Sequence, residues 1–167
     1  RMSRGLGDVY KRQTHGGRKY PRDYRGSAKK GIFALSMERI LIIDDDITFA
    51  LMLKTWLSKK GFRTETAASV AAARTALAEG GFSLVLSDMR LPDEDGIALL
   101  QWMSGQRIEV PVIVMTSYAE IQNAVRCMKL GARDYVAKPV NPDELLKKIR
   151  EALDAPAPVG DVPPVTP

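Results

Sequence analysis

The sequence predicts an α/β fold in which one parallel sheet of five strands is covered by helices on both faces. Two observations predict it. From Met37 onward, short apolar runs alternate with amphipathic segments, so the chain is a series of strand–helix–strand units. Runs that are apolar throughout, such as residues 40–43 and 112–115, are typical of strands buried on both faces of a parallel sheet. The expected architecture is a doubly wound, three-layer α/β/α domain.

Apolar spacing and capping residues locate the individual elements. Strands are expected at residues 39–43, 62–67, 84–87, 112–115 and 134–137. Helices are expected at residues 47–60, 70–79, 97–104, 120–130 and from 142 to about 153. Ser69 is a suitable N-cap for the second helix, which Gly80 can end. Asn141, followed by Pro142 and later by Glu144, is a strong helix start.

The composition is typical of a single soluble domain with tails. The chain has 167 residues, of which 45% are hydrophobic and 27% are charged. No apolar run approaches the ~20 residues needed to span a bilayer, and the first forty residues lack the apolar core of a secretory signal. A single cysteine, Cys127, excludes an internal disulfide and a cysteine-based metal cluster. We therefore expect a cytoplasmic protein that does not bind a membrane.

The excess of positive charge belongs to the first 36 residues. Residues 1–36 hold ten of the 25 basic side chains and two of the 20 acidic ones, so the remainder is mildly acidic. The same segment holds His15, the only histidine, which argues against histidine catalysis in the rest of the chain. Histidine metal sites are excluded there on the same ground.

The two ends of the chain differ in composition from the part between them. Residues 1–36 show no helical or strand periodicity, which favours a disordered basic leader. Residues 3–13 resemble a translated sequencing adapter, so we expect this leader to be non-native; a basic arm for nucleic acid or an anionic membrane is the alternative. Residues 37–154 would then form the domain. Residues 155–167, with five prolines, would form a linker or tail.

Polar side chains follow four of the five strands at the point where each ends. These residues are Asp44, Asp45 and Asp46 after the first strand, Asp88 after the third, Thr116 after the fourth and Lys138 after the fifth. Because the carboxyl ends of parallel strands meet at one edge of a sheet, we expect these groups to converge. Crowded carboxylates suit a hard cation such as Mg²⁺. An ammonium and a hydroxyl beside them suit a phosphoryl group, which a free carboxylate can accept as an aspartyl phosphate.

Four motifs in this order resemble the receiver domain of bacterial two-component response regulators. They are Ile-Ile-Asp44-Asp45, Leu-Ser-Asp88-Met-Arg-Leu-Pro, Val-Met-Thr116-Ser and Tyr135-Val-Ala-Lys138-Pro139. The resemblance runs from about Arg39 to Leu153 and implies a flavodoxin-like fold. It implies that Asp88 receives a phosphoryl group from a sensor histidine kinase or a phosphotransfer protein. Such a domain is a signalling module rather than an enzyme, apart from self-phosphorylation by small donors and autodephosphorylation.

The resemblance also implies roles for the other motif residues. Mg²⁺ would be held by Asp44, Asp45, Asp88 and the backbone carbonyl of Arg90, although Asp46 leaves the acidic pair ambiguous by one place. Lys138 would bind the phosphoryl group, and its bond to Pro139 would be cis. Thr116 and Tyr135 would couple the site to an output face. Arg90 and Tyr118, two residues beyond Asp88 and Thr116, would tune the lifetime of the phosphoryl group.

Residues 116–139 are similar to receivers of NtrC-like regulators, which activate sigma-54-dependent transcription. Those proteins carry an ATPase and a DNA-binding domain after the receiver, and neither is present in this sequence. We therefore expect control of transcription through an absent effector domain, which would make the only contact with DNA. A homodimer formed on phosphorylation is a further expectation. A stand-alone receiver is the alternative.

The acidic residues after the first strand also fit two rival assignments. Asp44, Asp46 and Thr48 fit the Asp-x-Asp-x-Thr pattern of haloacid-dehalogenase-like phosphatases, with Asp44 as nucleophile and Asp46 as general acid. That assignment does not explain Asp88, and the domain is short for such an enzyme. The same acids could instead cap the first helix. Residues 93–95 are expected to form a solvated turn rather than ligands.

Overall fold

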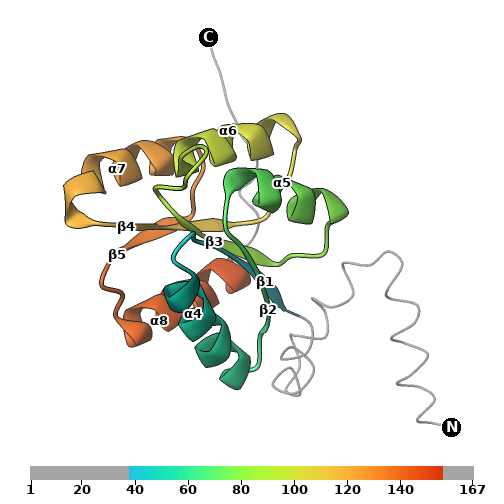
Figure 1. Ribbon diagram of the computed structural model, residues 1–167, viewed down its shortest axis with the longest axis vertical. Coiled ribbons are helices and arrows are strands. Elements are labelled where there is room, and N and C mark those ends of the chain that lie inside the picture. The colour runs from blue at the N-terminus through green and yellow to red at the C-terminus, as the bar shows by residue number, and fades with distance from the viewer. Residues whose placement is uncertain (1–37, 156–167) are drawn as a thin grey trace, which may run out of the picture.

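The computed structural model describes residues 38–155, which form one parallel sheet between two layers of helices (Figure 1). The described elements, in chain order, are β1 (Arg39–Ile43), α4 (Ile47–Lys59), β2 (Arg63–Ala67), α5 (Val70–Glu79), β3 (Leu84–Asp88), α6 (Gly96–Gly105), β4 (Val112–Thr116), η1 (Tyr118–Glu120), α7 (Ile121–Lys129), β5 (Asp134–Ala137) and α8 (Pro142–Asp154). The predicted three-layer α/β/α fold with five strands and five helices is confirmed. The expected leader and most of the expected tail lie outside the described residues.

The order of the strands brings the ends of β1 and β3 together at the centre of the sheet. The order is β2-β1-β3-β4-β5, and all neighbouring strands run parallel. Ile43 of β1 is the register partner of Ser87 of β3, so the residues that follow, Asp44 and Asp88, lie side by side at the carboxyl ends of the two strands. The order reverses between β1 and β3, which is where sheets of this kind place their functional groups.

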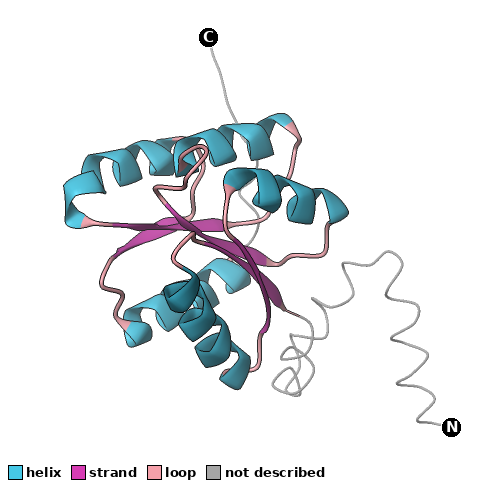
Figure 2. Ribbon diagram, viewed as in Figure 1, coloured by secondary structure: helices cyan, strands magenta, loops and turns pink. Residues whose placement is uncertain are grey.

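The two helical layers differ in size. Helices α4 and α8 cover one face of the sheet, and α5, α6 and α7 cover the other (Figure 2). Successive side chains of a strand point to opposite faces, so Ile40 and Ile42 pack toward α4 and α8 while Leu41 and Ile43 pack toward the other layer. All four are fully buried. The central strands are thus held by apolar burial on both faces, as the continuous apolar runs predict.

Helix starts are fixed by side chains that accept hydrogen bonds from otherwise free backbone N–H groups. Ser69 caps α5 and Asn141 caps α8, as the sequence predicts, while Asp46 and Asp95 cap α4 and α6. The main departure from the predicted elements is at residues 118–120, where a 3₁₀ turn precedes α7. Among the described residues, no helix is long and apolar enough to cross a membrane.

Candidate functional site

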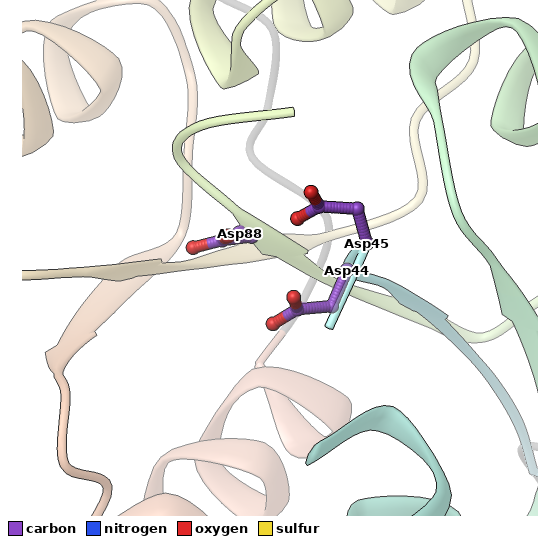
Figure 3. Close-up of side chains that lie close together, drawn as sticks. All are labelled: Asp44, Asp45 and Asp88. Carbon is purple, nitrogen blue, oxygen red and sulfur yellow. The ribbon is translucent and has the colours of Figure 1, made fainter. Parts of the chain in front are cut away.

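Three aspartates converge at the carboxyl ends of β1 and β3. Oxygen atoms of Asp44, Asp45 and Asp88 all lie within 4.8 Å of one another. Figure 3 shows Asp44 and Asp45 leaving the end of β1 beside Asp88 at the end of β3. Asp44 is buried, Asp88 is partly buried and Asp45 is exposed, so the cluster opens to solvent on one side. The predicted convergence of these acids at one edge of the sheet is therefore present in the structure.

The three consecutive aspartates after β1 have three different environments. The carboxylate of Asp44 turns into the site, and its Oδ1 accepts a hydrogen bond from the backbone N–H of Asp46 at 2.9 Å. The Oδ1 atom of Asp46 accepts from the N–H of Phe49 at 3.0 Å and so caps α4. Asp46 does not belong to the cluster. The cluster thus contains Asp44 and Asp45, whereas Asp46 has the helix-capping role.

Lys138 places its ammonium group between the two most buried carboxylates. Its Nζ donates to Asp44 Oδ2 at 2.8 Å and lies 3.3 Å from Asp88 Oδ1. The same Nζ lies 4.5 Å from the centre of the Phe49 ring, an arrangement in which a cation is attracted to the aromatic face. The Lys138–Pro139 peptide bond is cis, the geometry that the resemblance implied.

The charges in this cluster do not balance. Burial raises the pKa of Asp88 above its ordinary value, and the charge of Asp44 raises it further, although Lys138 acts in the opposite direction. Burial by itself would lower the pKa of Lys138, but its hydrogen bond to Asp44 and the charge of Asp88 outweigh burial and raise it. Three carboxylates face one ammonium group. Carboxylate oxygens with a surplus of negative charge fit a hard divalent cation such as Mg²⁺.

Thr116 and Tyr135 lie on the two strands that follow β3 in the sheet. Thr116 ends β4 with its side chain buried, and its Oγ1 donates to the backbone carbonyl of Ser117 at 3.1 Å. Its own carbonyl accepts from the N–H of Lys138 at 2.7 Å, which ties the ends of β4 and β5 together. The Tyr135 ring is partly buried against the core beneath α5, α6 and α7, with Lys148 Nζ 5.3 Å from the ring centre.

Arg90 and Tyr118 occupy exposed positions in the segments that follow β3 and β4. Tyr118 begins η1 and is 76% exposed. The Arg90 guanidinium binds the Glu120 carboxylate, with Nε 2.7 Å from Oε2. No motif in the sequence points to Glu120. Its partner is thirty residues away in the chain, and no local pattern links the two.

The segment after β3 is also attached to the helix that begins at Val70. Both carboxylate oxygens of Asp93 accept from the first amides of α5, Val70 N–H and Ala71 N–H, at 2.9 Å each. The Glu94 carboxylate pairs with Arg74 at 3.0 Å. Residues 93–95 are exposed and lie outside the aspartate cluster, as expected of a solvated turn, but the bonds of Asp93 and Glu94 to α5 were not predicted. The free N–H groups at a helix start attract a carboxylate even when it belongs to another part of the chain. These hydrogen bonds lower the pKa of Asp93.

Comparison with known proteins decides the family. The model of the response regulator receiver domain matches residues 40–150. The chain belongs to this family. It is 40% identical over 116 residues to the transcriptional regulatory protein GltR of Pseudomonas aeruginosa, an alignment that covers 68% of this chain and 48% of GltR. It is also 40% identical over 118 residues to the regulatory protein AtoC of Escherichia coli, covering 71% of this chain and 26% of AtoC.

Two of the solved structures that resemble this chain are receiver domains. A CheY-like receiver domain protein from Methanospirillum hungatei is 39% identical with a TM-score of 0.67, covering 71% of this chain and 95% of that one. The receiver domain of NtrX from Brucella abortus is 31% identical with the same TM-score, covering 70% and 99%. AtoC and ZraR of Escherichia coli and PilR of Pseudomonas aeruginosa are relatives consistent with the NtrC-like subfamily. The phosphatase alternative is not supported.

Proposed function

We propose that this receiver accepts a phosphoryl group on Asp88 and that phosphorylation changes the conformation of a distant surface. The observation that carries this proposal is the position of Lys138 between Asp44 and Asp88 in a cluster of three carboxylates. Asp88 is the better acceptor of the two because 15% of its side chain is exposed, whereas the Asp44 side chain is fully buried with both oxygens bonded. A phosphoryl donor from solvent can therefore reach the carboxylate of Asp88 but not that of Asp44.

The oxygen that attacks can also be proposed from the contacts. Oδ1 of Asp88 accepts from the N–H of Met89 at 3.0 Å and faces Lys138. Oδ2 is then the nucleophile, and its attack on phosphorus breaks the bond to the leaving group. The leaving group is the imidazole nitrogen of a phosphohistidine on a sensor histidine kinase or phosphotransfer protein, which takes up a proton afterwards. Lys138 and the hydroxyl of Thr116 would bind oxygens of the transferred group.

A divalent cation would complete this site. Asp44, Asp45 and Asp88 would hold Mg²⁺ with the backbone carbonyl of Arg90, which follows Asp88 by two residues. The bound ion would neutralise charge on the phosphoryl oxygens and on the carboxylates during transfer. The carboxylates contribute hard oxygen ligands from two adjacent strand ends, a donor set that Mg²⁺ prefers.

Thr116 and Tyr135 would transmit the conformational change that phosphorylation causes. Attraction of the Thr116 hydroxyl toward the phosphoryl group would shift the segment after β4 and favour an inward position of Tyr135 in an existing two-state equilibrium. Tyr118 and Arg90, in the exposed segments beside Asp88, would set how fast water removes the group. In the cell, the output would be transcription regulation through an effector domain, and a homodimer formed on phosphorylation is one route to it. Relatives named as transcriptional regulators support this assignment.

The test is phosphorylation of the whole chain by acetyl phosphate. The protein is incubated with and without Mg²⁺, and the adduct is detected by intact mass and located by peptide mapping. We expect one phosphoryl group on Asp88 that requires Mg²⁺, is absent in Asp88→Asn and is strongly reduced in Asp44→Asn. Asp93→Asn is the matched control, because Asp93 lies in the next segment but outside the cluster. Labelling of Asp44, or labelling that survives in Asp88→Asn, would overturn the proposal.

A further inference from the structure

A second polar cluster lies beside the acceptor site, and its carboxylate has no part in the function proposed above. Two nitrogens of the Arg90 guanidinium, Nε and Nη2, donate to the same oxygen of Glu120, Oε2. The other Glu120 oxygen, Oε1, accepts from the side-chain amide of Asn123 at 2.7 Å. Both oxygens of the Glu120 carboxylate are therefore engaged, one by the segment after β3 and one by the first turn of α7.

The burial of Glu120 distinguishes this pair from an ordinary surface ion pair. Its side chain is 13% exposed, whereas the side chain of Arg90 is 74% exposed. Exposed ion pairs contribute little to stability because solvent screens them and both side chains must be ordered. Here the carboxylate is largely withdrawn from water and fixed from two sides, and the guanidinium donates twice. These hydrogen bonds also lower the pKa of Glu120, those from Arg90 most strongly.

The pair connects the two segments that carry the chemistry. Arg90 is two residues beyond Asp88, and Glu120 is four residues beyond Thr116. On its other side, the segment after β3 is bonded to the start of α5 through Asp93. Arg90 also forms an isolated antiparallel bridge with Asp95. The backbone of Arg90 is therefore held within the segment by this bridge, and its side chain is held from outside by Glu120.

We propose that Glu120 is a positioning residue for the cation site: by binding the Arg90 side chain, it fixes the backbone carbonyl of Arg90 in the place where it can complete the ligands of Mg²⁺. This inference rests on the proposed function, since it requires that Asp44, Asp45 and Asp88 bind the ion. Glu120 touches neither the ion nor the phosphoryl group. It acts only through Arg90, so its removal weakens metal binding without disturbing the carboxylates.

The test is the affinity of the whole chain for Mg²⁺, measured by titration with amide shifts in NMR spectra as the signal. The variants are Glu120→Gln, Arg90→Gln and the double variant. Loss of one positioning contact predicts that each single variant binds Mg²⁺ about two- to fivefold more weakly, the range of a partly exposed ion pair. The double variant should bind no more weakly than either single variant, because the two residues act as one unit.

A purely electrostatic role predicts a different pattern and would overturn the proposal. Removing a negative charge near the ion weakens Mg²⁺ binding, whereas removing a positive charge strengthens it. Arg90→Gln would then bind more tightly than the wild type, and the double variant would return to the wild-type affinity. Glu94→Gln is the matched control, because Glu94 lies in the same segment as Arg90 but pairs with Arg74 of α5. This variant should leave the affinity for Mg²⁺ unchanged.

Failure of this inference can be told apart from failure of the proposed function. If wild-type protein binds Mg²⁺ and is labelled on Asp88, the function stands, and an unchanged affinity in Glu120→Gln overturns the positioning role alone. If wild-type protein binds no Mg²⁺, both fail. In phosphorylation by acetyl phosphate, the Mg²⁺ concentration for half-maximal rate should rise by the same factor in Glu120→Gln, while the maximal rate constant stays unchanged. A fall in the maximal rate with no shift in Mg²⁺ dependence would contradict positioning.

Discussion

Replacing Lys138 by methionine removes the ammonium group that lies between Asp44 and Asp88 while keeping most of the side chain's volume. At 2.8 Å and an effective dielectric constant of about 20, the attraction to Asp44 is on the order of 6 kcal/mol before the cost of desolvation. Breaking a fully buried pair destabilises a protein by about 3–5 kcal/mol. Because Lys138 is 27% exposed, we expect the free energy of unfolding to fall by less, about 2 kcal/mol.

The assay is urea unfolding at pH 7 followed by circular dichroism, with EDTA and again with saturating Mg²⁺. If repulsion among the carboxylates causes the loss, Mg²⁺ should shrink the difference between Lys138→Met and the wild type, because the ion replaces the missing positive charge. Lys147→Met is the matched control, since its partner Glu151 is 3.9 Å away and both side chains are exposed. It should change stability by less than about 0.5 kcal/mol.

The alkaline range gives a further check with a definite sign. The pKa of Lys138 is raised in the folded protein, so its contribution is fully present below the ordinary value of 10.5 and is lost as the pH rises through the raised value. The gap between wild type and Lys138→Met should therefore close only above pH 10.5. Equal stability of the two proteins in EDTA at pH 7, or a gap that Mg²⁺ leaves unchanged, would refute this reasoning.

Three further outcomes are expected, each measured by urea unfolding. Asp88→Asn should raise the free energy of unfolding at neutral pH in EDTA, because the raised pKa of Asp88 means that its ionisation opposes folding. This gain in stability should vanish below pH 3.8, where the carboxyl is protonated in both the folded and the unfolded state. A gain that persists below that pH would contradict this explanation. Asp93→Ala should lower the urea midpoint by freeing the first amides of α5. Because the pKa of Asp93 is lowered, that difference should be present above pH 3.8 and disappear as the pH falls through the lowered value; a pH-independent difference would count against it. Leu57→Ala, at a fully buried position on α4, should destabilise by about 2–5 kcal/mol. Leu51→Ala on the exposed side of the same helix should change stability by less than about 0.5 kcal/mol, and similar losses in both would refute the assigned faces.

The layers of the fold could be predicted because they depend on short-range patterns. The apolar run at 40–43 marks a strand buried on both faces, and the helix at 70–79 has its N-cap, Ser69, and the glycine that ends it, Gly80, in the sequence itself. The convergence of Asp44 and Asp88 could also be predicted, since parallel strands bring their carboxyl ends to one edge. In each of these cases, a short sequence pattern, or the rule that parallel strands end at one edge, is sufficient for the prediction.

Contacts between distant segments could not be predicted in this way. Asp93 looks like one acid in a turn, and only the folded chain shows that it caps a helix beginning 23 residues earlier. The pairing of Arg90 with Glu120 could not be predicted either, because in the sequence each of these side chains could equally have faced solvent. The helix predicted from the sequence begins at residue 120, so the 3₁₀ turn at 118–120 is largely missed, because its three residues carry no capping signal and a 3₁₀ turn differs from an α-helical turn only in hydrogen-bond spacing.

In the sequence, Asp44, Asp45 and Asp46 look equivalent, but in the folded structure they are not interchangeable. Asp44 is buried against Lys138, Asp45 faces solvent within the cluster, and Asp46 starts α4. Deleting any one of the three would leave the same sequence, two consecutive aspartates. The shortened chain would still have to fill three positions with two carboxylates, so either a member of the cluster or the cap of α4 would be lost. A frame-preserving deletion that barely alters composition would thus be more damaging than many single substitutions.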